Sequence, residues 1–185
     1  MSSHIFRVAA RTLRQGGVIG YPTESCYGLG CNPMHRRAAV SIIRLKRRSL
    51  SQGLLLVGAH IGHIKPYLSA EAMDMLEEPL QSWPGPFTWL LPASKRTPYW
   101  ITGGRDCVAV RISANRTIQR LCRNFAGAIV STSANPHGRP SAKTRSQVIR
   151  YFPDKLEMVV VGAIDGNPKP SQIKDARTGT ILRAN

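Results

Sequence analysis

The chain has 185 residues, and its 26 Lys and Arg outnumber its 10 Asp and Glu, which gives a formal net charge of +16. A hydrophobic content of 42% with 19% charged residues is typical of a folded protein and excludes a disordered chain. Apolar runs such as 54–57 are too short to span a bilayer. We therefore expect one globular domain over residues 1–185, with anionic partners such as nucleotides or RNA.

The N-terminal region and the cysteines predict a cytoplasmic protein. Arginines at positions 7, 11 and 14 interrupt the apolar stretch that a secretory signal would need. The cysteines form no C-x-x-C pair and are expected to be free thiols of a reducing compartment. They are Cys26, Cys31, Cys107 and Cys122.

The first predicted elements are a helix, a strand and a second helix. Apolar residues at helical spacing predict an amphipathic helix over 4–15, which Gly16 and Gly17 end. A short strand is predicted at 18–21, before Pro22 starts a turn into a glycine-punctuated segment. A helix over 36–48 carries cations at its C-terminal end, where they interact favourably with the helix dipole.

Further strands and helices alternate along the rest of the chain. Strands are expected near residues 53–58, 87–92, 107–112, 127–132, 158–162 and 179–183. Helices are expected near residues 69–82, 114–124 and 142–151. With the strand at 18–21, this alternation predicts an α/β fold with a mixed sheet covered by helices. Residues 165–170 are predicted to form a surface loop before the last strand.

Several common kinds of site are excluded or disfavoured by spacing. The sequence contains neither the phosphate loop G-x-x-x-x-G-K-[ST] nor G-x-G-x-x-G. His60 and His63 have no cysteine or carboxylate cluster nearby that would complete a zinc site, so surface histidines are expected. Cys26 and His137 could form a nucleophile and base, but a packed thiol is the favoured interpretation of Cys26.

Four polar segments follow apolar strands or lie beside them, and each has an ordinary structural alternative. Residues 22–29 could be a proline turn, 46–48 a solvated helix end, and 131–136 a turn before proline. The fourth segment, 83–88, is stiffened by two prolines. As binding elements, the cations of 46–48 suit a polyphosphate, and the hydroxyls of 131–136 suit phosphate oxygens or metal-bound water.

In order and spacing, these segments closely resemble the YrdC/Sua5 family. The resemblance runs from about residue 5 to the last strand. Its motifs are Pro22-Thr23-Glu24-Ser25 with Tyr27-Gly28-Leu29, the K-x-R element Lys46 and Arg48, Pro84-Gly85-Pro86 with Thr88, Val108-Ala109-Val110-Arg111, the S-x-N element Ser133 and Asn135 after Ser131, Gly138-Arg139-Pro140-Ser141, Ser171, and Ile181-Leu182-Arg183.

The resemblance implies an α/β fold with a twisted open mixed sheet, flanking helices and a central basic cavity. It also implies a nucleotidyltransferase that joins L-threonine, bicarbonate or CO2, and ATP into threonylcarbamoyl-AMP, releasing pyrophosphate. The product would serve the t6A modification at position 37 of tRNAs that read codons beginning with A. The chain ends at Asn185 without the extra domain of long members, so a separate transferase complex is the expected partner.

The resemblance also assigns residues to roles. ATP would be held by Lys46, Arg48, Thr88, Ser133, Asn135, Ser141 and Arg183. Threonine would be held by Thr23, Arg111, Ser131 and Ser171. Lys46, Arg48, Ser133 and Asn135 would be catalytic, and Mg²⁺ is expected through the ATP phosphates rather than in a protein cage.

Two alternatives remain open at this stage. The charge could serve a double-stranded RNA-binding or ribosome-maturation module without essential catalysis, with tRNA or double-stranded RNA as partner. The cations expected outside the cavity are Arg36, Arg37, Arg139, Lys143, Arg145 and Arg150. Larger proteins carry YrdC-like domains that adenylate other carbamates, but this sequence has none of their additional zinc or acyl-phosphatase segments.

Overall fold

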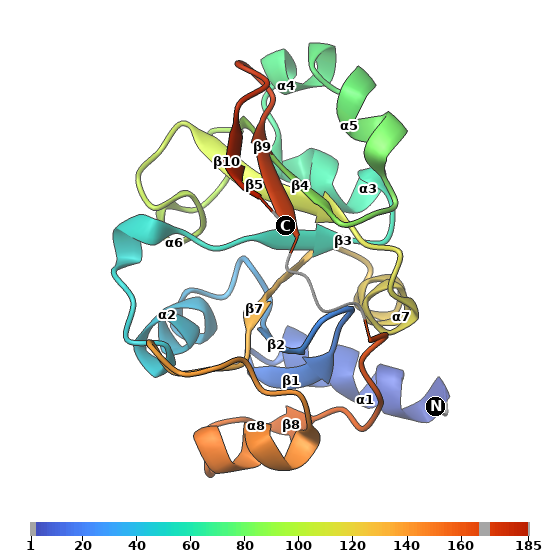
Figure 1. The fold of residues 1–185 in the computed structure, drawn as a ribbon, viewed down its shortest axis with the longest axis vertical. Coiled ribbons are helices and arrows are strands. Elements are labelled where there is room, and N and C mark those ends of the chain that lie inside the picture. Colours follow the sequence, from blue (N-terminus) through green and yellow to red (C-terminus); the bar gives the residue numbers. More distant parts are fainter. Residues whose placement is uncertain (1–2, 167–170, 185) are drawn as a thin grey trace.

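The computed structural model describes residues 3–166 and 171–184, which form two β-sheets surrounded by helices (Figure 1). The smaller sheet has the strand order β7-β2-β1-β8. Its strands are β1 (Ile19–Pro22), β2 (Tyr27–Gly30), β7 (Thr132–Ser133) and β8 (Met158–Val159). The larger sheet has the order β10-β9-β4-β5-β3-β6. Its strands are β3 (Leu56–Gly58), β4 (Phe87–Pro92), β5 (Cys107–Ile112), β6 (Ile129–Val130), β9 (Gln172–Asp175) and β10 (Ile181–Arg183).

Both sheets are mixed, in agreement with the predicted fold class. In the smaller sheet, β1 pairs antiparallel with β2 and parallel with β8. In the larger sheet, β5 pairs antiparallel with β4 and parallel with β3. The chain passes from β6 in one sheet to β7 in the other through the single residue Ser131. The predicted strand at 127–132 is therefore two short strands in different sheets.

The helices cover the outer faces of the sheets (Figure 1). They are α1 (Ser3–Arg14), α2 (Arg36–Leu45), α3 (Ile61–Ile64), α4 (Ala70–Asp74), α5 (Glu77–Ser82), α6 (Tyr99–Thr102), α7 (Arg116–Phe125) and α8 (Arg145–Tyr151). Short 3-10 turns span Leu50–Gln52 and Lys65–Tyr67. In α7, the side chain of Asn115 caps the first turn by accepting a hydrogen bond from Ile118 N, and Ala126 ends the helix in the left-handed region.

Two apolar clusters hold the sheets and helices together. One packs α1 and α7 against β1 through Phe6, Leu13, Tyr21 and Leu121. The other surrounds the fully buried ring of Trp89 on β4. Because each cluster contains residues from distant parts of the chain, burial of apolar surface fixes the relative positions of the elements that carry the polar residues.

Several element predictions need correction. The helix predicted at 69–82 is two helices, α4 and α5, and the helix predicted to reach residue 48 ends at Leu45. Strands β2 and β9 were not predicted, because glycines or polar residues obscure their alternation. The loop predicted at 165–170 precedes β9 rather than the last strand, and its residues 167–170 lie outside the described part. None of the helices described is long and apolar enough to cross a membrane.

Candidate active site

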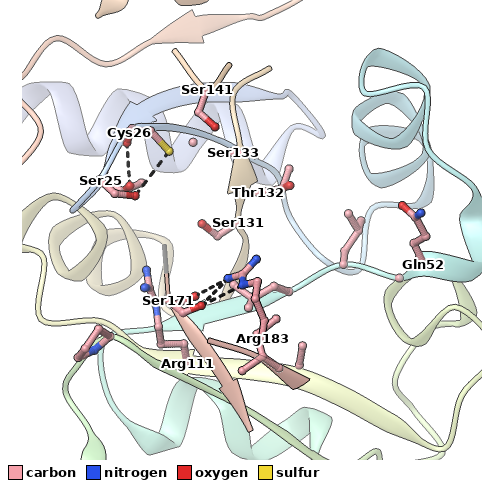
Figure 2. A pocket seen from close by; sticks show the side chains of 18 of the residues that line it. Ser25, Cys26, Gln52, Arg111, Ser131, Thr132, Ser133, Ser141, Ser171 and Arg183 are labelled. Carbon is pink, nitrogen blue, oxygen red and sulfur yellow. Dashed lines mark hydrogen bonds between the residues drawn. The ribbon is translucent and has the colours of Figure 1, made fainter. Parts of the chain in front are cut away.

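A cavity of about 510 Å³ lies between the two sheets and has walls from both. The loop between β1 and β2, together with β7, forms one side, and β5, β9 and β10 form the other. Figure 2 shows Ser131, Ser133 and Ser141 along one wall and Arg111, Ser171 and Arg183 on the facing wall. The polar segments therefore meet in a cavity between two sheets.

The structure brings all the predicted site residues into this region. Eight of them line the cavity: Thr23, Arg48, Arg111, Ser131, Ser133, Ser141, Ser171 and Arg183. Lys46, Thr88 and Asn135 are not in the wall, but each is hydrogen-bonded to a residue that is. Segments far apart in the sequence are thus assembled into one site.

The Lys46 side chain is only 2% exposed and is fixed behind the cavity wall. Its ammonium donates to the backbone oxygens of Ser133 and Asn135, and to the Asn135 side-chain oxygen at 3.0 Å. Ser133 Oγ in turn donates to Asn135 Oδ1 at 2.7 Å. Hydrogen bonds from Lys46 therefore stabilise the conformation of the S-x-N element on its side away from the cavity.

The end of α2 explains how Lys46 and Arg48 come to have different surroundings. Lys46 N still donates to Ile42 O, so this residue completes the last turn and its side chain points inward. Arg47 then adopts a φ of 50°, a conformation that is uncommon for a residue with a Cβ. The chain turns away, and Arg48 reaches the cavity from the exposed side.

Burial and, to a smaller extent, the positive charge of Arg48 lower the pKa of Lys46 to about 8. The Lys46 ammonium therefore loses its proton more easily than that of a lysine in water. A phosphate group placed beside it would stabilise the charged form.

Arg111 on β5 is 8% exposed and is held by a carboxylate from the opposite sheet. Its Nη2 atom donates to Glu24 Oε2 at 3.1 Å, and Ser113 Oγ donates to Glu24 Oε1 at 2.6 Å. The Nε atom of Arg111 is buried and has no hydrogen-bond partner. Leaving this donor buried without a partner is unfavourable, and the guanidinium as a whole borders the cavity.

Arg183 on β10 closes the facing wall beside Ser171. Its guanidinium donates to the backbone oxygen of Ser171 at 2.6 Å and to Ser171 Oγ at 3.1 Å (Figure 2). Thr88, which is 0% exposed, donates to the same Oγ at 3.1 Å from behind. The pKa of Arg183 is lowered by burial and by the positive charges of Arg111 and Arg48, so three guanidiniums face a common space.

Buried side chains also support the cavity wall that contains Ser131, Ser133 and Ser141. Tyr21, a buried residue of β1, donates its hydroxyl to Ser131 Oγ at 2.8 Å. Burial raises the pKa of Tyr21, which therefore remains a neutral donor. Thr23 Oγ1 donates to the backbone oxygen of Cys26 at 2.7 Å and shapes the turn before β2.

Sequence reasoning missed some of the lining residues. Arg105 and Gln52 both line the cavity, and Arg105 donates to the backbone oxygens of Ser51 and Gln52. Lys143 was expected outside the cavity but lines it, because its ammonium donates to the backbone oxygen of Ser25. The period-two alternation in β5 could have located Cys107, which shares the cavity-facing side with Ala109 and Arg111.

The alternative sites considered from spacing have no matching geometry. Cys26 lines the cavity, whereas His137 is exposed and lies outside its wall. The rings of His60 and His63 lie against each other with centroids 3.8 Å apart and an interplanar angle of 45°. Within residues 3–166 and 171–184, no group of three or more His, Cys, Asp or Glu is placed to hold a metal ion. All four cysteines are unpaired.

The floor of the cavity near Gln52 depends on a glycine. Gly53 has a φ of 64°, and a Cβ there would lie 2.5 Å from Ile101 O. We expect Gly53→Ala to lower the free energy of unfolding by about 3 kcal/mol, because strain and a backbone clash act together. Urea unfolding measures this change.

Gly138→Ala is the matched control, since Gly138 has a φ of 74° but no atom within 4 Å of an added Cβ. Gly138→Ala should lower the free energy of unfolding by about 1 kcal/mol, the cost of the backbone strain alone. Equal losses in the two variants would show that the clash with Ile101 has no effect.

Comparison with known proteins gives matches over nearly the whole chain. The Sua5/YciO/YrdC family model, described as "Telomere recombination", matches residues 11–185. A protein of Halorhodospira halophila named threonylcarbamoyl-AMP synthase is 46% identical over 180 residues, which cover 96% of this chain and 94% of the relative. A Pseudomonas aeruginosa protein of the same name is 44% identical over 184 residues, which cover 99% and 98%.

Solved structures show the same fold. Sua5 of P. abyssi in complex with L-threonine superimposes with a TM-score of 0.91 at 30% identity, covering 99% of this chain and 54% of that one. This chain therefore spans about half the length of that Sua5 protein. YciO of E. coli superimposes with a TM-score of 0.83 at 22% identity. The YciO superposition covers 98% of this chain and 89% of that one, so both likenesses extend over nearly all of this chain.

Proposed function

The chain belongs to the Sua5/YciO/YrdC family, and from this premise we propose that it condenses L-threonine, bicarbonate or CO2, and ATP into threonylcarbamoyl-AMP and pyrophosphate. The observation that carries the proposal is the cavity itself, whose wall contains five cationic side chains. They are Arg48, Arg105, Arg111, Lys143 and Arg183. Relatives named for this activity match the chain almost end to end.

The reaction explains why so much positive charge is needed. Threonine's amine would combine with CO2 to form a carbamate, and a carbamate oxygen would attack the α-phosphorus of ATP as pyrophosphate leaves. A carboxylate, a carbamate and a triphosphate must then lie side by side, so repulsion between like charges opposes the reaction. Fixed cations lower this barrier by stabilising charge and by holding the reactants in position.

The proposed roles follow the positions of the side chains. ATP phosphates would lie near Arg48 and the S-x-N element, with Lys46 behind it and Ser141 and Arg183 beside it. Threonine would lie near Thr23, Arg111, Ser131 and Ser171. Thr88 is fully buried and would act indirectly, by holding the Ser171 hydroxyl beside the threonine.

Mg²⁺ is proposed to enter with ATP. The wall offers the hydroxyls of Ser131 and Ser133 for metal-bound water, and its carboxylate Glu24 is engaged by Arg111 and Ser113. The ion would neutralise phosphate charge when bound. We further propose that the product passes in the cytoplasm to a separate transferase complex for t6A formation in tRNA.

The test is the product itself. Purified protein mixed with L-threonine, bicarbonate, Mg²⁺ and ATP should yield threonylcarbamoyl-AMP by mass spectrometry. Pyrophosphate release should require both threonine and bicarbonate. Pyrophosphate release without threonine, or activity with carbamoyl phosphate in place of threonine and bicarbonate, would contradict the proposal.

A second candidate function is binding to structured RNA through the paired helices α1 and α7. These helices pack side by side and contain no acidic residue (Figure 1). Their arginines are Arg7, Arg11, Arg14, Arg116, Arg120 and Arg123. This arginine face is outside the cavity wall, so it could contact a phosphate backbone while the cavity works on small substrates.

We expect the triple variant Arg7→Glu, Arg11→Glu and Arg116→Glu to bind double-stranded RNA at least about tenfold more weakly in low salt. Threonylcarbamoyl-AMP formation should stay unchanged. Fluorescence anisotropy over a salt series measures the affinity and its salt dependence. The control variant is Arg36→Glu, Arg37→Glu and Arg150→Glu, which changes the net charge by the same amount. An equal loss of RNA affinity in this control would show that the arginines of α1 and α7 are not a specific binding face.

A further inference from the structure

Among the described residues, Glu24 is the only carboxylate in a cavity wall that holds five cations. Its position is fixed from the opposite sheet by Arg111 Nη2 at 3.1 Å and Ser113 Oγ at 2.6 Å. Ser113 is itself fully buried and accepts a hydrogen bond from Asn115 N at 3.1 Å. Glu24 therefore cannot turn away from the cavity without breaking a network that joins the two sheets.

The carboxylate of Glu24 has capacity for a further partner. A carboxylate offers about four acceptor positions, and the contacts with Arg111 and Ser113 use two of them. The side chain is 18% exposed and borders the cavity. An incoming cationic donor could thus bind Glu24 without displacing Arg111.

Arg111 presents the complementary feature next to it. Its Nη2 is paired with Glu24, and its guanidinium borders the cavity. The pair therefore offers guanidinium N–H groups and unused acceptor positions side by side. An α-amino acid carries an anionic and a cationic group on a single carbon atom, so its zwitterionic end matches this arrangement.

We propose that Glu24 binds the α-ammonium of the amino-acid substrate and makes the site specific for a zwitterion. This deepens the proposed function and depends on it. Glu24 would also position Arg111 for the substrate carboxylate. In a cavity that otherwise attracts anions indiscriminately, one carboxylate would favour an amino acid over a simple carboxylic or hydroxy acid.

A purely structural role is the competing explanation. Glu24 could serve only to neutralise the buried guanidinium of Arg111. The two roles predict different affinities for a ligand that lacks the ammonium. If Glu24 contacts the ammonium directly, its loss weakens only ligands that carry this group. If Glu24 acts only through Arg111, its loss weakens both kinds of ligand equally.

The experiment compares L-threonine with its α-hydroxy analogue, 2,3-dihydroxybutyrate of the same configuration, by isothermal titration calorimetry. The wild-type protein should bind threonine at least about 30-fold more tightly than the analogue, as expected for a hydrogen bond to a charged group. Glu24→Gln should lose about 30-fold in threonine affinity while its affinity for the analogue stays within about twofold. Glu77→Gln, which removes an exposed carboxylate from α5, should bind both ligands like the wild type.

Equal losses for the two ligands in Glu24→Gln would overturn the inference, because Glu24 would then act only through Arg111. Unchanged threonine affinity in this variant would overturn it too. If Glu24→Gln does not fold, Glu24→Asp decides: a greater loss for threonine than for the analogue supports direct contact, and equal losses refute it. Failure of the wild type to form threonylcarbamoyl-AMP would refute the proposed function instead, so the two failures are distinguishable.

Discussion

Replacing Lys46 with methionine should lower threonylcarbamoyl-AMP formation by at least about 1,000-fold, because it removes both the support of the S-x-N element and a positive charge directly behind the wall that would face the phosphates. Methionine fills most of the lysine's volume and leaves no buried charge, so the fold should persist. Mass spectrometry of the product, with circular dichroism of the variant, measures both effects. Activity within about tenfold of the wild type would show that Lys46 is not part of the catalytic site.

The lowered pKa of Lys46 also predicts a pH dependence. Between the folded value of about 8 and the ordinary value of 10.5, the folded chain binds fewer protons at this group than the unfolded chain, so the group makes stability rise with pH there. ATP binding favours the charged ammonium and should have the opposite dependence. Its affinity should fall as pH rises through about 8.

Proton uptake separates this effect from other titrations. At pH values above about 8, calorimetry in two buffers of different ionisation enthalpy should show about one proton taken up per ATP bound, and Lys46→Met should lose this uptake. Equal uptake in both proteins would show that the phosphates do not approach Lys46.

Arg111→Lys should raise the KM for threonine by about 100-fold while leaving ATP affinity within about twofold. The lysine keeps a positive charge opposite Glu24, so no carboxylate is left buried without a partner. It loses the planar fork that could bind Glu24 and a substrate carboxylate together. Steady-state kinetics with either substrate varied measures the separation.

Arg96→Lys is the control, because Arg96 is exposed and lies outside the cavity wall. It should leave both constants unchanged. A parallel loss of ATP affinity in Arg111→Lys would place Arg111 at the nucleotide instead, near Arg183 and Arg48, whose charges share the same space.

The sequence predicted helices and strands most accurately where the periodicity of apolar residues matches the face that the element buries. Strands β4 and β5 begin and end at the predicted residues, and α1 lies within one residue of its predicted bounds. In β5, alternation places Arg111 on the cavity side and Val110 in the core. Strand β9 escaped prediction because its polar residues become strand only by pairing with β4 and β10.

Motifs whose joint spacing resembles a known family also predicted candidate site residues, and the structure brings these residues together around one cavity. The sequence did not show how those residues contact one another. Spacing could not place Lys143 in the cavity or Lys46 behind it, because the first depends on a contact with Ser25 and the second on the turn at Arg47. These contacts require chain segments to be already folded against each other.

The amino-acid sequence by itself determined the class of fold, the excess of positive charge and a set of candidate site residues. Only the tertiary structure decided that two sheets enclose the cavity, that Ser131 joins them, and that Glu24 meets Arg111 across it. The reason is physical: helices and strands follow from interactions between near neighbours in the chain, whereas the cavity is made by contacts between residues that burial of the two apolar clusters brings together.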